Sequence, residues 1–268
     1  MSDPYPDFAR DEVTYDGVTR TVFRAGRGPA VIVIHEVPGL YPAVVDFGRR
    51  LVAAGFTVYM PSLFGTPGRE MGVAYSLRSI ARACVAREFT VWATRKTSPI
   101  TAWLRALARD AHLACGGPGV GAIGMCLTGG FALAMMVDDV VVAPVLSQPS
   151  IPFGVTRAQR RDLGIDDATL AGVKQRAAAG TCVLGLRFTG DRLVPPERFA
   201  RLREELGDRF LAVEIDSSPG NPHGIRRLAH SVVTFDLVDE PGHPTRAALE
   251  QVLAFFHERL THREQRTL

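Results

Sequence analysis

The segment Gly124–Gly129 (GMCLTG) places Cys126 between an apolar run and a stretch of small helix-forming residues. The run 120–123 predicts a strand, and residues 130–136 predict a helix. A strand, an abrupt turn and a helix have the form of a nucleophile elbow, with cysteine where serine is commoner. So tight a turn strains the nucleophile's backbone and requires neighbours that lack a Cβ. It also aims a helix N-terminus at the sulfur, which favours the thiolate. The alternative is a buried cysteine that acts as a small hydrophobic residue.

Other residues with reactive side chains also follow apolar runs. Glu36 comes just after the run 30–34, and Asp191 comes just after the run 182–188. In an open parallel sheet, reactive side chains gather beyond the carboxyl ends of the strands. Asp191 has an alternative role as a helix cap or turn former before the next helix. Glu36 has an alternative role as a hydrogen-bond partner of a neighbouring turn.

Three histidines follow the run 210–215, in a loop rich in turn residues. They are His223, His230 and His243. Nucleophile, acid and then histidine is the chain order of α/β-hydrolases. The chemistry alone allows any of the three to act as the base.

These residues require a frame of alternating strands and helices, which predicts an α/β fold with a mostly parallel sheet covered on both faces. An Asp-Gly turn at 16–17 predicts a hairpin over 12–23. No repeat or linker interrupts the pattern, so we expect a single domain over 1–268, with a lid-like irregular excursion and one short helix near 147–180. The other expected strands are 30–34, 56–60, 120–123, 140–145, 182–188 and 210–215. One helix is expected to end at residue 54, and others are expected over 76–95, 98–112, 195–206 and 245–260.

Composition limits the classes of function. The chain has 268 residues, 46% of them hydrophobic, and a net charge of +3. So slight a charge indicates neither a nucleic-acid partner nor a membrane surface. The four cysteines form no CxxC pair, and neither a basic, apolar leader nor a membrane-length apolar run is present. We therefore expect a reduced, cytoplasmic protein.

Two further patterns are weaker signals. Residues 119–124 spell GxGxxG, but these glycines precede and enter a strand instead of opening a helix, so no dinucleotide cofactor is expected. His112 and Cys115 are spaced as a ligand pair, yet two ligands make a poor metal site. We expect no cofactor and no metal.

Four segments together resemble the dienelactone hydrolase family of α/β-hydrolases. They are 31–39 (VIVIHEVPG), 124–130 (GMCLTGG), 190–195 (GDRLVP) and His230-Ser231, which stands at the family's distance from Phe255-Phe256. The similarity covers roughly residues 12 to 260. It implies an α/β-hydrolase fold and a small ester or lactone as substrate, without a cofactor. Residues 216–228 then form a local insertion.

The resemblance also implies roles for single residues. Cys126 matches the nucleophile, His230 the base and Asp191 the residue that orients the imidazole. Glu36 matches a glutamate that lies beside the thiol and helps to control its protonation and rotamer. The backbone N–H groups of Leu127 and Val37 would then form the oxyanion hole.

One departure puts the family's substrate in question. Family members that act on dienelactone carry an arginine shortly after the histidine, where this chain has Thr234. Arg82, Arg87 and Arg95 are other sources of a cation. A carboxylesterase or thioesterase on the same residues, a non-catalytic binding module and a redox-responsive thiol protein remain alternatives. A homodimer is left open, since the sequence does not decide the oligomeric state.

Overall fold

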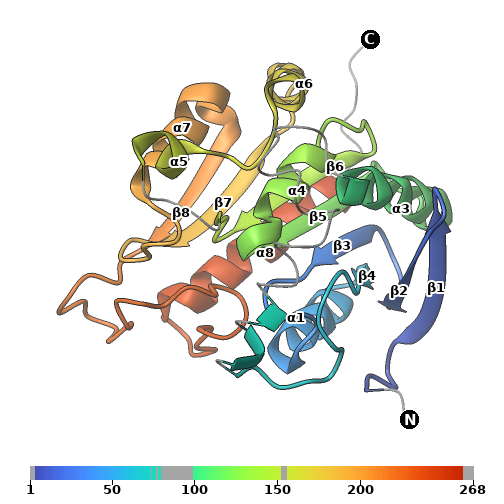
Figure 1. Ribbon diagram of the computed structural model, residues 1–268, viewed down its shortest axis with the longest axis horizontal. Coiled ribbons are helices and arrows are strands. Elements are labelled where there is room, and N and C mark those ends of the chain that lie inside the picture. Colours follow the sequence, from blue (N-terminus) through green and yellow to red (C-terminus); the bar gives the residue numbers. More distant parts are fainter. Residues whose placement is uncertain (1–3, 73, 77, 80–98, 152–155, 262–268) are drawn as a thin grey trace.

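The computed structural model describes residues 4–72, 74–76, 78–79, 99–151 and 156–261. An eight-stranded sheet of order β1-β2-β4-β3-β5-β6-β7-β8 runs through it (Figure 1). Pairing is antiparallel from β1 to β2 and from β2 to β4, and parallel in the rest of the sheet. The strands are β1 (Ala9–Tyr15), β2 (Val18–Ala25), β3 (Ala30–Ile34), β4 (Thr57–Pro61), β5 (Val120–Met125), β6 (Val141–Ser147), β7 (Val183–Phe188) and β8 (Phe210–Ile215).

The predicted N-terminal hairpin is confirmed. Asp16 and Gly17 join β1 to β2, with φ angles of 50° and 77°. A two-residue hairpin turn needs such left-handed backbone at both positions, which Asp tolerates and Gly adopts freely. This explains why the Asp-Gly pair marks the turn so clearly in the sequence.

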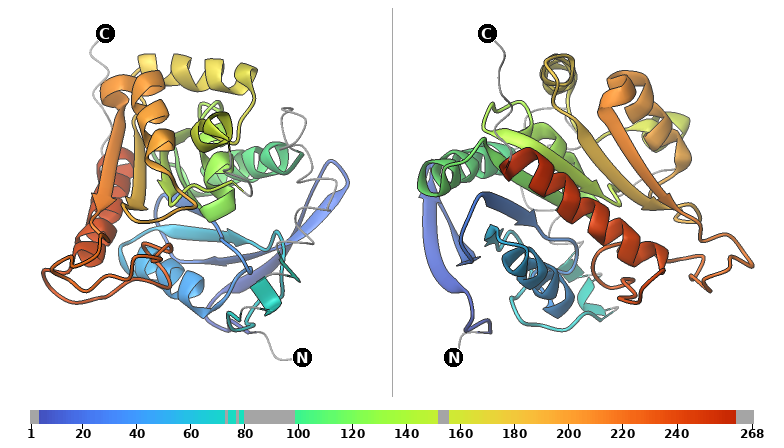
Figure 2. Two further views of the ribbon diagram at one scale, coloured as in Figure 1. Left: turned by 60° about the vertical axis from the view of Figure 1, so that its left-hand side comes forward. Right: turned by 180° about the vertical axis from the view of Figure 1, so that it is seen from behind.

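Helices cover both faces of the sheet because its central strands are apolar on both sides. All five residues of β3 are buried. Val31 and Val33 pack in the core that includes α1 and α8, whereas Ile32 and Ile34 pack in the core that includes α3, α4 and α7. Figure 2 shows α1 and α8 together on one side of the sheet. These helices are α1 (Pro42–Ala53), α3 (Pro99–Cys115), α4 (Gly129–Met135), α7 (Pro196–Leu206) and α8 (Pro244–Thr261).

The segment 147–180 differs from the expectation of one short helix. Its described residues form two helices, α5 (Arg157–Arg161) and α6 (Asp167–Ala178), and β6 extends to Ser147. Asp166 caps α6 by accepting a hydrogen bond from the Thr169 amide at 2.6 Å. Only Val173 and Ala177 of α6 are buried, so the helix carries too little apolar periodicity to be recognised in the sequence. The expected helix over 76–95 falls largely outside the described residues.

No helix in the described part of the chain is long and apolar enough to cross a bilayer. The described cysteines, Cys115, Cys126 and Cys182, are all free thiols.

Candidate active site

Cys126 follows β5 on the expected abrupt turn. Its φ angle is 56°, a strained value for a residue with a side chain. A short 3₁₀ helix (Cys126–Thr128) leads directly into α4. A Cβ on Gly124 would lie 2.2 Å from the Thr128 carbonyl oxygen, and one on Gly129 would lie 2.6 Å from the Cβ of Pro149. The two glycines therefore permit the close approach of strand, helix and neighbouring loop that holds Cys126 in this conformation.

Thr128 occupies the position two residues after the cysteine, where an elbow often has glycine. Its buried hydroxyl accepts a hydrogen bond from the Met125 amide at 2.8 Å and donates to the Ile34 carbonyl at 2.9 Å. The threonine thus fastens the elbow to the end of β3, the strand that leads into Glu36.

His230 and Asp191 are in direct contact. The Nδ1 atom of His230 lies 2.6 Å from Oδ2 of Asp191, whose other oxygen accepts a hydrogen bond from the Leu193 amide at 2.9 Å. Asp236 holds the backbone in place by accepting hydrogen bonds from the amides of His230 and Ser231, at 2.8 and 3.0 Å. Both the ring and the main chain of this histidine are therefore fixed.

The His230 ring also interacts with the Cys126 side chain. Nε2 is buried and has no hydrogen-bond partner among the described residues. Burial by itself lowers the pKa of His230, but the negative charge of a Cys126 thiolate and the Asp191 hydrogen bond outweigh it, so the pKa lies well above the ordinary value. The arrangement favours the protonated form of the His230 imidazole.

The other two histidines lie together, away from Asp191. Their rings meet edge to face with centroids 5.5 Å apart. His223 is exposed, and Nδ1 of His243 lies 2.7 Å from the Thr245 hydroxyl at the start of α8. Of the three candidate bases, the structure brings only His230 to the predicted acid.

The thiol has a hydrogen-bond partner that the sequence analysis missed. Sγ of Cys126 lies 3.0 Å from Oγ of Ser150, and the Ser150 amide donates to the Cys126 carbonyl at 2.9 Å. Ser150 is 5% exposed and follows β6, the parallel neighbour of β5. Because reactive side chains gather beyond the carboxyl ends of parallel strands, the residues after β6 were also candidates, and Ser150 is one of them.

Glu36 is buried, with 1% of its surface exposed, and four neutral groups hold its carboxylate. Tyr41 donates to Oε1 at 2.6 Å, and the Thr234 hydroxyl donates to the same oxygen. Gln148 and Ser231 donate to Oε2 at 3.0 and 2.7 Å. These hydrogen bonds join the end of β3 to Tyr41, to the residue that follows β6 and to the loop of His230. The implied position of Glu36 beside the thiol stays a prediction.

Two backbone amides are expected to form an oxyanion hole. Val37 follows Glu36, and Leu127 follows Cys126. The Val37 N–H has no acceptor among the residues that the structure describes. It therefore remains free to donate to a ligand.

With this geometry established, comparison with known proteins identifies the family. The sequence profile of the dienelactone hydrolase family matches residues 16–260. The chain belongs to this family.

Solved structures of this family share the fold. The dienelactone hydrolase from Anabaena variabilis has 15% sequence identity and a TM-score of 0.59, with 95% of this chain and 99% of that one covered. A dienelactone hydrolase-like promiscuous phosphotriesterase from metagenomic libraries has 17% identity and a TM-score of 0.60, with 94% and 98% covered. The fold is accordingly the α/β-hydrolase fold that the sequence predicted.

One curated relative matches a short segment. YghX of Escherichia coli strain K12, named as a hydrolase fragment, is 40% identical over 50 residues. The segment covers 17% of this chain and 43% of that relative, so the match spans less than half of the relative's length.

Two sequence patterns, the GxGxxG glycines and the spaced metal-ligand pair, lie outside the candidate site of this dienelactone hydrolase family member. The GxGxxG glycines lie before and within β5, where a Cβ on Gly121 would lie 2.7 Å from the ring of Phe256 in α8. Gly121 therefore permits close packing of α8 against β5. Among the described residues, no three histidine, cysteine or acidic side chains are grouped as metal ligands.

Proposed function

We propose that this chain hydrolyses a small ester or lactone with Cys126 as nucleophile, His230 as general base and Asp191 as the group that orients the imidazole. The observation that carries the proposal is the 2.6 Å contact between Nδ1 of His230 and Asp191, on a ring that also interacts with the Cys126 side chain. A nucleophile, a base and an orienting acid are the three parts that covalent acyl transfer requires.

The proposed first step is attack of the Cys126 thiolate on the carbonyl carbon. The carbonyl oxygen becomes an oxyanion, for which the amides of Val37 and Leu127 are the donors we propose. The tetrahedral intermediate collapses and the bond to the leaving alkoxide breaks. The imidazolium of His230 protonates that alkoxide, leaving an acyl-enzyme thioester and a neutral imidazole.

In the second step, the neutral His230 takes a proton from water. The hydroxide attacks the thioester, and the second tetrahedral intermediate expels the Cys126 thiolate. The acid product leaves, and the imidazolium–thiolate pair is restored. Asp191 stays ionised and stabilises the charged imidazole in both steps.

Ser150 and Glu36 act on this chemistry as positioning residues in the proposal. Ser150 holds the thiol group, since its hydroxyl lies 3.0 Å from the sulfur. Glu36 binds Ser231, the neighbour of His230, and so keeps the histidine loop against the end of β3. Through this loop, Glu36 also influences which rotamer the thiol can adopt.

The test is turnover of a panel of activated esters, thioesters and lactones by purified Cys126→Ala. We expect complete loss of hydrolysis with an unchanged circular dichroism spectrum. The matched control is Cys115→Ala, which removes another free thiol and should retain activity. Unchanged turnover by Cys126→Ala would end the cysteine mechanism. Inertness of the wild type on the whole panel would favour a binding or redox role for Cys126.

A further inference from the structure

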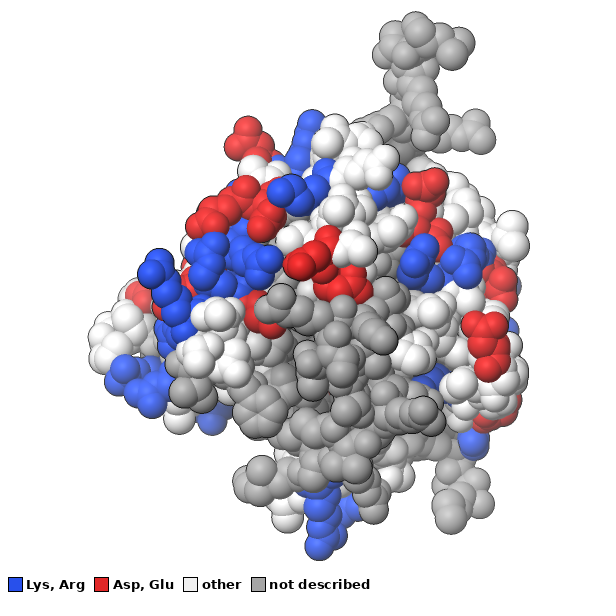
Figure 3. Space-filling model, turned by 45° about the horizontal axis from the view of Figure 1, so that its top comes forward, with Lys and Arg blue, Asp and Glu red and all other residues white. Residues whose placement is uncertain are grey.

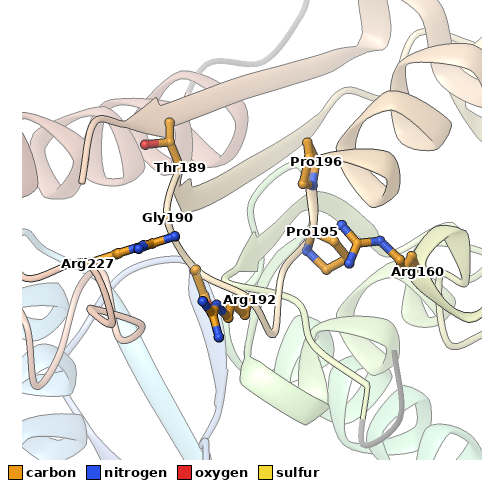
Figure 4. Close-up of a pocket in the computed structure, with 8 residues that line it drawn as sticks. Arg160, Thr189, Gly190, Arg192, Pro195, Pro196 and Arg227 are labelled. Atoms are coloured by element: carbon orange, nitrogen blue, oxygen red, sulfur yellow. The ribbon is translucent and has the colours of Figure 1, made fainter. Parts of the chain in front are cut away.

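A pocket of about 470 Å³ lies beside the loop that carries Asp191. Three arginines line it, together with Asp191 itself and the two prolines at the start of α7. Figure 4 shows Arg192 and Arg227 on one side of this pocket and Arg160 on the other, next to Pro195 and Pro196. The two prolines lack an amide hydrogen, so at these positions the loop offers a ligand no backbone donors.

The three arginines differ in how their charge is used. Arg160 forms two hydrogen bonds to the Glu197 carboxylate, at 2.9 and 3.0 Å. Neither Arg192 nor Arg227 has an acidic partner among the described residues, and both are exposed. The pocket therefore retains two positive charges that the protein does not neutralise.

Neighbouring cations on the same part of the surface are paired. Arg226, next to Arg227 in the chain, lies 2.6 Å from Asp236. Lys174 of α6 lies 2.8 Å from Glu205 of α7. The face in Figure 3 likewise shows basic and acidic side chains interspersed. Arg192 and Arg227 differ from these two neighbours because neither has an acidic partner among the described residues.

The one acid in the pocket wall cannot serve as their partner. Oδ2 of Asp191 faces His230 at 2.6 Å, and Oδ1 accepts the Leu193 amide at 2.9 Å. One oxygen is therefore engaged by the loop of His230 and the other within its own loop, which leaves the arginines to an external anion.

The two arginines belong to the two loops that carry the proposed acid and base. Arg192 follows Asp191 directly, and Arg227 stands three residues before His230. The loops touch at Gly190, where a Cβ would lie 2.9 Å from the Arg227 carbonyl oxygen. A ligand held by both guanidinium groups would bridge these loops.

We propose that this pocket is an oxyanion-binding site, in which Arg192 and Arg227 hold a carboxylate or phosphate group. The planar guanidinium matches both groups with paired N–H donors. The volume is larger than a lone oxyanion needs, so the group belongs to an organic molecule. Two sources share this chemistry: an anionic arm of the substrate and a separate organic anion.

The first experiment measures binding and does not depend on hydrolysis. Inorganic phosphate and succinate are titrated into the wild type and into Arg192→Gln/Arg227→Gln by calorimetry, at ionic strength kept constant with sodium chloride. The double variant should bind at least about tenfold more weakly, since charge-assisted hydrogen bonds are lost. The control Arg27→Gln/Arg209→Gln removes two exposed charges elsewhere and should bind like the wild type. Absence of binding to the wild type, or equal binding by the pocket variant, would overturn the proposal.

The second experiment identifies the source of the anion and rests on the proposed function. An uncharged aryl acetate and the aryl monoester of succinic acid are compared as substrates. For a substrate-borne anion, the pocket variant raises KM for the charged ester alone. For a separate ligand, succinate changes turnover of the uncharged ester by the wild type and not by the pocket variant. If neither ester is hydrolysed, the proposed function fails while the binding result stands. If both are hydrolysed and neither effect appears, the pocket has no link to the reaction and the proposal is overturned.

Discussion

Asp191 and Glu36 are two buried carboxylates at the ends of parallel strands, and they differ in what holds them. Asp191 follows β7 and shares its charge with an imidazole, His230. Glu36 follows β3 and accepts hydrogen bonds from three hydroxyls and an amide, none of which is a cation. A carboxylate facing a titratable base can stabilise a charge that appears during a reaction. One saturated by neutral donors fixes the segments that supply those donors.

The surroundings of Asp191 and Glu36 therefore have different tasks. The region around Asp191 orients His230, the proposed base, and the pKa of His230 is raised because the Cys126 charge and the Asp191 hydrogen bond outweigh burial. The region around Glu36 ties together the ends of β3 and β6 and the loop of His230. Substitutions in the first region should therefore act on catalysis, and those in the second mainly on stability.

Asp191→Asn should give the largest effect. The amide cannot stabilise the imidazolium, and it leaves the wrong ring nitrogen protonated, so we expect kcat to fall by about 10³- to 10⁴-fold, as in serine triads. Steady-state kinetics on one activated ester measure this. Asp216→Asn, an exposed acid in the next loop, is the control and should keep the wild-type rate. A similar rate in both variants would remove Asp191 from the mechanism.

Glu36→Gln should act mainly on folding. The amide nitrogen would face donors that now meet a carboxylate oxygen, so the free energy of unfolding should fall by about 2 to 3 kcal/mol. Urea denaturation measures this, and kcat should fall less than in Asp191→Asn. A loss of kcat equal to that of Asp191→Asn at unchanged stability would mean that Glu36 takes a direct part in the chemistry, against the comparison.

Thr234→Val should give the smallest effect. It removes one of the four donors to Glu36 without changing the side-chain shape, so we expect a loss of about 1 kcal/mol of stability. The control is Thr14→Val on the exposed hairpin, which should stay within about 0.5 kcal/mol of the wild type. If thermal denaturation gave equal midpoints for Thr234→Val and the wild type, the Glu36 cluster would not be held as described.

Much of the candidate site can be predicted from the sequence because its residues follow directly from local patterns. The elbow, the apolar strands and the residues that follow them are contiguous, so Cys126, Glu36 and Asp191 can be placed without knowing the packing. The partners of Glu36 and of the thiol come from distant segments that meet only in the folded sheet. Ser150 illustrates this, since it follows a different strand and bonds the thiol across 24 residues.

Thr234 shows a second limit of the sequence. The family comparison presents it as the loss of a cation, whereas in the structure its hydroxyl binds Glu36. The weakly amphipathic helix α6 shows a third, because its few buried residues give no clear period. Side-chain partners and partly buried helices are decided by tertiary contacts, which local patterns do not encode.

The central claim is that His230, held by Asp191, is the base that serves Cys126. It is tested most directly by kcat of His230→Ala and His243→Ala on one activated ester. We predict that His230→Ala loses about 10³-fold or more, while His243→Ala stays close to the wild type, because His243 contacts Thr245 and not Asp191. Near-normal turnover by His230→Ala, with collapse of His243→Ala, would contradict the account.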